Sequence, residues 1–354
     1  MITYFFHYFH IFLFAVCIAL GVFSLLIVYN KYHCRINHMG GIILERLCTN
    51  ILENIGCTPM VRLKRLRGAN DAEILVKVEF LNPGGSIKSR SALAMIEAAE
   101  NEGKLHDGSV IVEPTSGNQG VGLAMVGAVK GYQVKIIMPA SVSLERKKII
   151  EQYGAEVILI KDLGDIGKTM ESCIQTALDL AELDKNIFVP QQFSNPNNPL
   201  IHNNTTAQEI LSQIEYPIDA FCSGIGTGGT ITGIGEALKK AFPKIKIFAV
   251  EPENGAMLSG GKLGNHIQQG IGDGIMPPIL NCGIIDGTIT VSDKQALETA
   301  RRLSSMEGLL AGISSGSNVW AAMKLARELG KNKTVLTILP DNAERYFSTE
   351  LFAD

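Results

Sequence analysis

From residue 39 onward, short apolar runs alternate along the chain with longer amphipathic stretches. The apolar runs predict strands, and the amphipathic stretches predict helices. The predicted strands are Glu73–Phe80, Val110–Glu113, Val134–Met138, Glu156–Ile160, Ala220–Ser223, Lys246–Val250 and Thr334–Leu339. The predicted helices include Ser86–Asn101, Gln119–Lys130, Leu144–Tyr153, Asp165–Leu183, Thr206–Ile214 and Gly229–Ala241. This alternation predicts the α/β class, with parallel sheets that helices cover on both faces.

In such sheets, ligands bind beyond the carboxyl ends of the strands, so the loops that follow strands are candidates for chemistry. The loop after the first predicted strand reads NPGGSIKSR over residues 82–90. Its glycines let the backbone approach a ligand, and Ser86 can cap the next helix. Lys88 then lies in the first helical turn, where the positive end of the helix dipole lowers the pKa of its amine and suits a Schiff-base nucleophile. The alternative is a solvated surface lysine.

Two further loops carry hydroxyl and amide side chains at predicted helix starts. The segment EPTSGNQG, residues 113–120, offers hydroxyls and backbone N–H groups that can cradle a carboxylate. The segment GISSGS, residues 312–317, follows an apolar run in the same way. Taken singly, each of these segments is also compatible with an ordinary capping turn.

The segment SGIGTGGTITG, residues 223–233, is the richest in glycine and threonine. At a strand-to-helix junction it can form a phosphate cup of backbone N–H and hydroxyl donors. Gly224, Gly226 and Gly229 also satisfy the GxGxxG pattern, and Glu251 follows the next predicted strand, where a ribose-binding acid would lie. A nicotinamide-dependent oxidoreductase is therefore an alternative, although the dense hydroxyl pattern favours a monophosphate.

The first 30 residues differ from the rest of the chain. Residues 2–30 contain no Asp, Glu, Lys or Arg, and residues 11–29 are almost wholly apolar. Their length suits a transmembrane segment, and Lys31 and Arg35 behind it would leave the remaining chain in the cytoplasm. Met39 opens MGGIILERL, so residues 1–38 are alternatively a mis-called start before a soluble enzyme.

Composition narrows the functional classes. The 354 residues suit about two domains, and the net charge of −3 gives no electrostatic argument for nucleic acid. Seven cysteines without a CxxC pair indicate reduced thiols of a cytosolic compartment, and the sequence predicts no metal site.

Read together and in order, the four loops resemble the cysteine synthase (O-acetylserine sulfhydrylase) and cystathionine β-synthase family of fold type II pyridoxal-phosphate enzymes. The resemblance runs from about Ile51 to Thr349. It implies two subdomains, each with a twisted, mostly parallel sheet flanked by helices, as in the tryptophan synthase β-like fold. The smaller, mobile subdomain would span residues 81–191, the larger one residues 39–80 and 192–354, and the enzyme would be a homodimer.

The resemblance also implies roles for single residues. Lys88 would hold pyridoxal 5'-phosphate as a Schiff base and shuttle the substrate proton. Asn118 would bond the ring hydroxyl, and Ser314 would meet the pyridine nitrogen. The phosphate cup would consist of Gly226, Thr227, Gly228, Gly229 and Thr230. The substrate carboxylate would bind to Thr115, Ser116, Gln119 and Gln192.

The reaction that the resemblance implies is β-replacement through an aminoacrylate, in which O-acetyl-L-serine and sulfide give L-cysteine and acetate. A hydroxyl partner for the pyridine nitrogen suits this chemistry, because a weaker electron sink favours β-elimination over transamination. The chain departs from the family pattern at Ser89, Gln119 and residues 342–343. A cofactor-free regulatory homologue is a non-enzymatic alternative, which the intact cofactor positions disfavour.

Asp273, in the segment GIGDG, is the most informative departure, because cysteine synthases commonly carry a small residue there. A carboxylate beside the pocket could act as a base toward water or a second thiol. The alternative function is therefore an L-cysteine-consuming, hydrogen-sulfide-producing lyase or β-replacement enzyme. Asp273 could also be a solvent-exposed turn residue.

Overall fold

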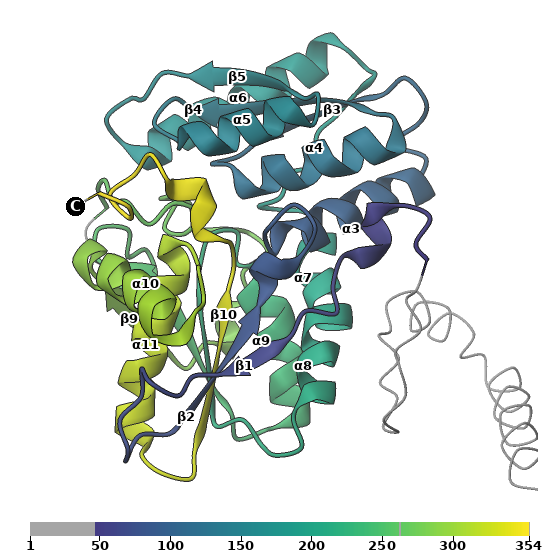
Figure 1. Ribbon diagram of the computed structural model, residues 1–354. Coiled ribbons are helices and arrows are strands. Elements are labelled where there is room, and N and C mark those ends of the chain that lie inside the picture. Colours follow the sequence, from purple (N-terminus) through teal and green to yellow (C-terminus); the bar gives the residue numbers. More distant parts are fainter. Residues whose placement is uncertain (1–46, 262, 354) are drawn as a thin grey trace, which may run out of the picture. The chain divides into compact units, whose positions relative to one another are not determined.

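The structure is a computed structural model that describes residues 47–261 and 263–353 (Figure 1). The apolar stretch at residues 2–30 and the boundary at residue 38 lie outside these described residues. Among the described residues, no helix is both long enough and apolar enough to cross a membrane. Residues Asn50–Asp354 form one compact unit, which contains both sheets.

The larger sheet has six strands in the order β1-β2-β10-β7-β8-β9. All neighbouring strands run parallel except β1, which is antiparallel to β2. The strands are β1 Met60–Arg62, β2 Glu73–Val78, β7 Ala220–Gly224, β8 Lys246–Pro252, β9 Gly287–Val291 and β10 Thr334–Leu339. The last strand in the sequence, β10, thus lies between β2 and β7.

Helices cover both faces of this sheet, because its central strands are apolar on both sides. Ile74 and Val76 of β2 pack with α10, Asp293–Glu307, and α11, Ile313–Leu329. Leu75, between them, packs on the opposite face with α8, Ala207–Gln213, and α9, Gly229–Ala241. Alternation of side chains along a strand places consecutive residues in the two different cores.

The smaller sheet has four parallel strands in the order β5-β4-β3-β6. They are β3 Val110–Pro114, β4 Gln133–Pro139, β5 Glu156–Ile160 and β6 Ile187–Phe188. One face packs against α3, Lys88–Asn101, α4, Asn118–Lys130, and α5, Leu144–Gln152. The other face packs against α6, Ile166–Leu183. The short helix α7, Asn197–Ile201, follows this sheet in the chain.

The α/β class and the mostly parallel sheets are confirmed. Each predicted strand corresponds to an observed one, with ends that differ by a few residues. Strands β1, β6 and β9 were not predicted. The three residues of β1 and the two of β6 are too few to show periodicity. The helix predicted from Ser86 begins at Lys88, although the Ser86 hydroxyl still accepts the Lys88 N–H at 3.3 Å.

Candidate active site

The ends of three neighbouring strands and a loop of the second sheet meet at one pocket. Strands β2, β10 and β7 are adjacent in the larger sheet, so the loops that follow them leave the same edge. The loop after β3 approaches from the smaller sheet. The pocket is lined by residues that follow β2, β3 and β7, namely Lys88, Thr115, Ser116, Asn118, Gln119, Gly226, Thr227, Gly228 and Thr230. Gln192 after β6, Asp273 after β8 and Ser314 of α11, Ile313–Leu329, also line it. Of the predicted site residues, Gly229 alone is absent from this lining, and it is buried as the first residue of α9.

Lys88 is the first residue of α3, and its side chain enters the pocket. Its ammonium nitrogen lies 3.4 Å from the hydroxyl oxygen of Thr227. Burial lowers the pKa of Lys88 to about 8, and the charge of Asp273 opposes this shift. The predicted direction is thus correct, but the cause is desolvation of the ammonium group rather than the helix dipole.

The glycine-rich loop between β7 and α9 has no room for side chains at its glycine positions. Gly228 has a φ of +79°, in the left-handed region that glycine adopts without strain. A Cβ atom on Gly226 would lie 2.3 Å from the carbonyl oxygen of Gly270. Helix α9 begins at Gly229, and the first turn of a helix presents N–H groups without intrahelical acceptors. With the hydroxyls of Thr227 and Thr230, this donor set fits a phosphate group.

The loop after β3 presents further donors on the opposite side of the pocket. The Thr115 hydroxyl accepts the Gly117 N–H at 3.1 Å and helps to form the turn before α4. The Ser91 hydroxyl donates to the side-chain oxygen of Gln119 at 2.8 Å. Among the described residues, the buried side-chain nitrogen of Gln119 has no hydrogen-bond acceptor. A ligand with an acceptor group would remove the cost of leaving this donor unpaired.

Polar side chains that are distant in the sequence bind both the nitrogen and the oxygen of the Asn118 side-chain amide. Its Nδ2 donates to Asp341 at 2.7 Å, and its Oδ1 accepts from Arg345 at 2.6 Å. Arg146 contacts the same carboxylate of Asp341 at 3.4 Å. Sequence reasoning missed these three residues. Only the position of Asp341 beyond the end of the predicted strand Thr334–Leu339 could have indicated it.

Ser314 and Asp273 complete the lining. Ser314 is the second residue of α11 and is buried at the pocket. Asp273 is only 6% exposed, so the alternative of a solvent-exposed turn is wrong. Burial raises the pKa of Asp273, and the charges of His266 and Lys88 oppose the rise. A carboxyl group with a raised pKa beside an amine is typical of acid–base chemistry.

Glu251, the residue predicted for ribose binding in the nicotinamide alternative, is engaged elsewhere. Its carboxylate accepts the N–H groups of Leu258 and Ser259 at 2.7 and 3.1 Å, and the Ser259 hydroxyl at 2.7 Å. It does not line the pocket of Lys88. This geometry favours a structural role for Glu251 over the contact that a dinucleotide would need.

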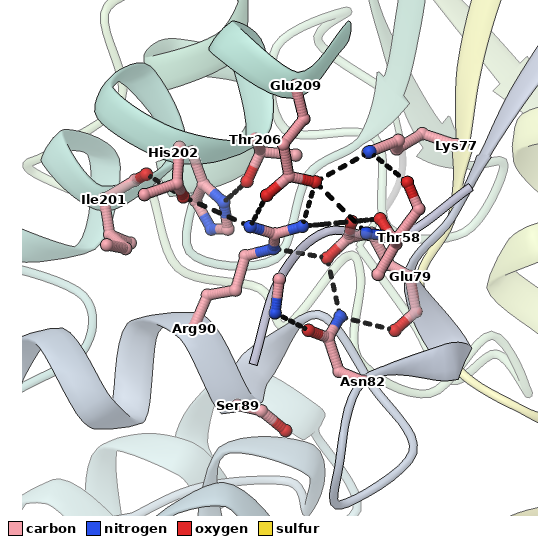
Figure 2. A network of polar contacts seen from close by, with 12 residues as sticks. Thr58, Lys77, Glu79, Asn82, Ser89, Arg90, Ile201, His202, Thr206 and Glu209 are labelled. Atoms are coloured by element: carbon pink, nitrogen blue, oxygen red, sulfur yellow. Dashed lines mark hydrogen bonds and ion pairs between the residues drawn. The ribbon is translucent and has the colours of Figure 1, made fainter. Parts of the chain in front are cut away.

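A buried ion network holds Arg90, which lies in the first turn of α3 two residues after Lys88 (Figure 2). Arg90 reaches Glu79 at 2.7 Å and Glu209 of α8 at 2.6 Å, and Lys77 of β2 reaches Glu209 at 2.7 Å. Burial acts to raise the pKa of Glu79, but the charge and hydrogen bonds of Arg90, together with the charge of Lys77, outweigh burial and lower the pKa to about 2. The network ties α3 to elements of the larger sheet, so it limits the positions that Lys88 can take.

Within residues 47–261 and 263–353, no group of three or more His, Cys, Asp or Glu side chains could hold a metal ion. Burial raises the pKa values of the Cys173 and Cys222 thiols to about 12. Neither thiol is therefore suited to act as a thiolate nucleophile.

Comparison with known proteins gives concordant matches. Residues 51–341 match the family model described as pyridoxal-phosphate dependent enzyme. A cysteine synthase of Staphylococcus aureus is 50% identical over 305 residues, which cover 86% of this chain and 97% of the relative. A hydrogen sulfide-producing enzyme of Fusobacterium nucleatum superposes with a TM-score of 0.81 at 40% identity, covering 85% of this chain and 100% of that structure. An O-acetylserine-dependent cystathionine β-synthase of Helicobacter pylori superposes with a TM-score of 0.82 at 35% identity, covering 87% and 100%.

Proposed function

Because this chain belongs to the pyridoxal-phosphate dependent enzyme family, we propose that it is a cysteine synthase that converts O-acetyl-L-serine and sulfide into L-cysteine and acetate. The identity of 50% to a curated cysteine synthase over nearly its whole length supports this assignment. Membership in this family also favours pyridoxal phosphate over the nicotinamide cofactor of the alternative interpretation.

The observation that carries the proposal is the arrangement of three features around one pocket. A partly buried amine, that of Lys88, lies beside a glycine–threonine loop at the start of α9. The hydroxyl and amide groups of residues 115–119 face the same pocket. An amine, a phosphate cradle and a carboxylate cradle are the groups that a pyridoxal-phosphate enzyme needs for an amino-acid substrate.

The residues present fit the coenzyme. Lys88 would hold its aldehyde, and the loop from Gly226 to Thr230 would hold its phosphate. Asn118 would meet the ring hydroxyl, and Ser314 would meet the pyridine nitrogen. When bound, pyridoxal phosphate supplies an electron sink for the negative charge that develops at the substrate α-carbon. The hydroxyl of Ser314 carries no charge, so it leaves the ring a weaker sink than a carboxylate partner would.

The protein groups carry the proton transfer and the binding. With a pKa of about 8, roughly a fifth of Lys88 is neutral near physiological pH, so its amine can remove the α-proton. Thr115, Ser116, Gln119 and Gln192 would bind the substrate carboxylate through hydroxyl, amide and backbone N–H donors. The unpaired amide nitrogen of Gln119 supports its place in this set.

Asp273 supports a second candidate function, the release of hydrogen sulfide from L-cysteine. Its buried carboxyl lines the pocket that contains Lys88, and burial raises its pKa. Such a group can take a proton from water or from a second thiol that attacks the β-carbon. The similarity to a hydrogen sulfide-producing enzyme adds weight to this candidate.

A substrate panel with sulfide and cysteine detection tests both candidates. We expect cysteine formation from O-acetyl-L-serine and sulfide, and a yellow enzyme that loses its colour with borohydride. If the enzyme releases sulfide from L-cysteine alone faster than it consumes sulfide in the presence of O-acetyl-L-serine, the second candidate function replaces the first. Unchanged sulfide release in the Asp273→Ala variant would exclude Asp273 as the base.

The organisation of the enzyme is proposed from the same family. Residues 81–191 would form the smaller, mobile subdomain, which agrees with the bounds of strands β3 to β6. Residues 39–80 and 192–354 would form the larger one. Closure of the smaller subdomain over the substrate would exclude water, and the enzyme would be a homodimer. Sedimentation analysis tests the dimer, and X-ray scattering with and without substrate tests the closure.

A further inference from the structure

Glu113 is a buried carboxylate beside the pocket to which no role has been given. It lies near the end of β3 and is 0% exposed. One of its oxygens accepts the Gln191 N–H at 2.8 Å, and the other accepts the Gln192 N–H at 2.8 Å. The two consecutive N–H groups thus point at one carboxylate, and each oxygen has its own donor.

The backbone segment that Glu113 binds contains a strained residue. Gln191 has a φ of +57°, in the left-handed region that non-glycine residues rarely adopt. Such a residue persists only where its surroundings fix it. Two hydrogen bonds to one buried carboxyl group fix both amides and so help to offset this strain.

The next residue, Gln192, connects this backbone to the pocket. Its side-chain nitrogen donates to the Pro114 carbonyl at 3.2 Å, directly before the loop of residues 115–119. Its own carbonyl accepts from Asn198 at 2.8 Å, and the same Asn198 nitrogen lies 3.0 Å from the Thr227 hydroxyl. A shift of Gln192 would therefore disturb both the substrate loop and the phosphate loop.

We propose that Glu113 is a positioning residue for substrate binding, which fixes the backbone of Gln191 and Gln192 and so holds Gln192 against the loop of residues 115–119. This inference rests on the proposed function, since it assigns the loop and Gln192 to the substrate carboxylate. Glu113 binds the backbone N–H groups of Gln191 and Gln192 and is absent from the pocket lining, so it acts on the pocket through Gln192.

Burial raises the pKa of the Glu113 carboxyl group to about 8, although the two backbone N–H donors oppose the rise. The two hydrogen bonds from Gln191 and Gln192 should therefore strengthen when this group loses its proton, as the pH rises through about 8.

Glu113→Gln tests the proposal, because it keeps the volume but replaces one acceptor by an N–H donor. We expect the KM for the amino-acid substrate to rise about tenfold, the effect of losing one buried hydrogen bond. The KM for sulfide should stay the same, and kcat should change less than the KM for the amino acid. Glu251→Gln is the matched control, since Glu251 also lies near the end of a strand and binds two consecutive backbone N–H groups, at Leu258 and Ser259.

A double-mutant cycle separates positioning from general destabilisation. If Glu113 acts through Gln192, the variant with both Glu113→Gln and Gln192→Ala should have the same KM as Gln192→Ala alone. Additive effects, or an equal change of KM in Glu251→Gln, would overturn the proposal. Should Glu113→Gln fail to fold, Glu113→Asp takes its place in the same cycle. Its side chain is one methylene shorter, so its carboxyl group lies farther from the Gln191 and Gln192 amides.

Amide hydrogen exchange provides a readout that does not depend on activity. In the enzyme without coenzyme, the Gln191 and Gln192 amides should exchange at least about tenfold faster in Glu113→Gln than in the wild type. Unchanged exchange at both amides would overturn the proposal. If exchange changes as expected but the wild-type enzyme turns over no O-acylated serine, the proposed function fails. The role of Glu113 in fixing the backbone of Gln191 and Gln192 then still stands.

Discussion

The side-chain nitrogen of Lys88 lies 3.4 Å from the hydroxyl of Thr227, although 139 positions separate the two residues in the sequence. Lys88 follows β2, and Thr227 follows β7. Between these two strands lies β10, which comes from the C-terminal part of the chain. The proposed amine and the proposed phosphate cradle are therefore neighbours only after the last strand has entered the sheet.

The amine of Lys88 should react with an aldehyde at unusually low pH. With a pKa of about 8, its neutral form increases as the pH rises through 8, whereas an ordinary lysine stays charged up to about pH 10. We expect labelling of residue 88 by pyridoxal phosphate and borohydride to rise with a midpoint near pH 8, followed by peptide mass spectrometry. Lys294, which is exposed, is the internal control. A midpoint for Lys88 equal to that of Lys294 would contradict the prediction.

Removing the charge of Asp273 should move this midpoint to lower pH. Its carboxylate stabilises the ammonium form of Lys88 and so raises the pKa of that group. In Asp273→Asn the amine loses this support, and its labelling curve should shift toward acid. Asp286→Asn serves as the control, because Asp286 pairs with Lys239 and Lys246 instead. A shift toward alkaline pH would show that Asp273 does not act on Lys88 by its charge.

Gly226→Ala should weaken coenzyme binding. The new methyl group would lie 2.3 Å from the Gly270 carbonyl oxygen, so one of the two loops must move. We expect the Kd for pyridoxal phosphate to increase at least about tenfold, measured by absorbance titration of the coenzyme-free protein. At Gly264 no atom lies closer than 3.9 Å to such a methyl group, so Gly264→Ala should bind normally. Equal affinity of the two variants would exclude the loop as the phosphate cradle.

Arg90→Met should destabilise the fold strongly. It leaves Glu79, which is fully buried, without its main positive partner. Removing one member of a buried ion pair costs about 3–5 kcal/mol of the free energy of unfolding, whereas an exposed pair contributes less than about 1 kcal/mol. Urea denaturation of Arg90→Met and of Lys294→Ala, from an exposed pair with Glu298, provides the comparison. Similar losses in both variants would show that the buried network is not a main support of α3.

The same network should make the wild-type protein sensitive to acid. Glu79 has a pKa of about 2 in the folded state, below its ordinary value of 4.5. A carboxyl group with a depressed pKa contributes stability that is fully present above about pH 4.5 and is lost as the pH falls toward 2. Urea midpoints measured between pH 6 and pH 3 should therefore decrease more steeply in the wild type than in Arg90→Met. Parallel curves would contradict the assignment to Glu79.

The sequence by itself determined the local structure and the location of the candidate chemistry. Apolar runs of strand length and amphipathic stretches gave the α/β class, because side-chain periodicity is a local property. The glycines and hydroxyls of residues 82–90, 113–120 and 223–233 marked loops that follow strands. The resemblance to a known family then assigned a role to each side chain, and these roles stay predictions.

The tertiary structure alone decided which of these loops meet and what surrounds them. No local pattern specifies that β10 lies between β2 and β7, because strand order depends on long-range packing. The contacts of Asp341 and Arg345 with Asn118 arise from that order. The contacts of Glu113 with residues 191–192 arise from the pairing of β3 with β6 in the smaller sheet. Burial of Asp273 and the lowered pKa of Lys88 depend on the same packing, since desolvation is a property of the assembled pocket and not of the residue.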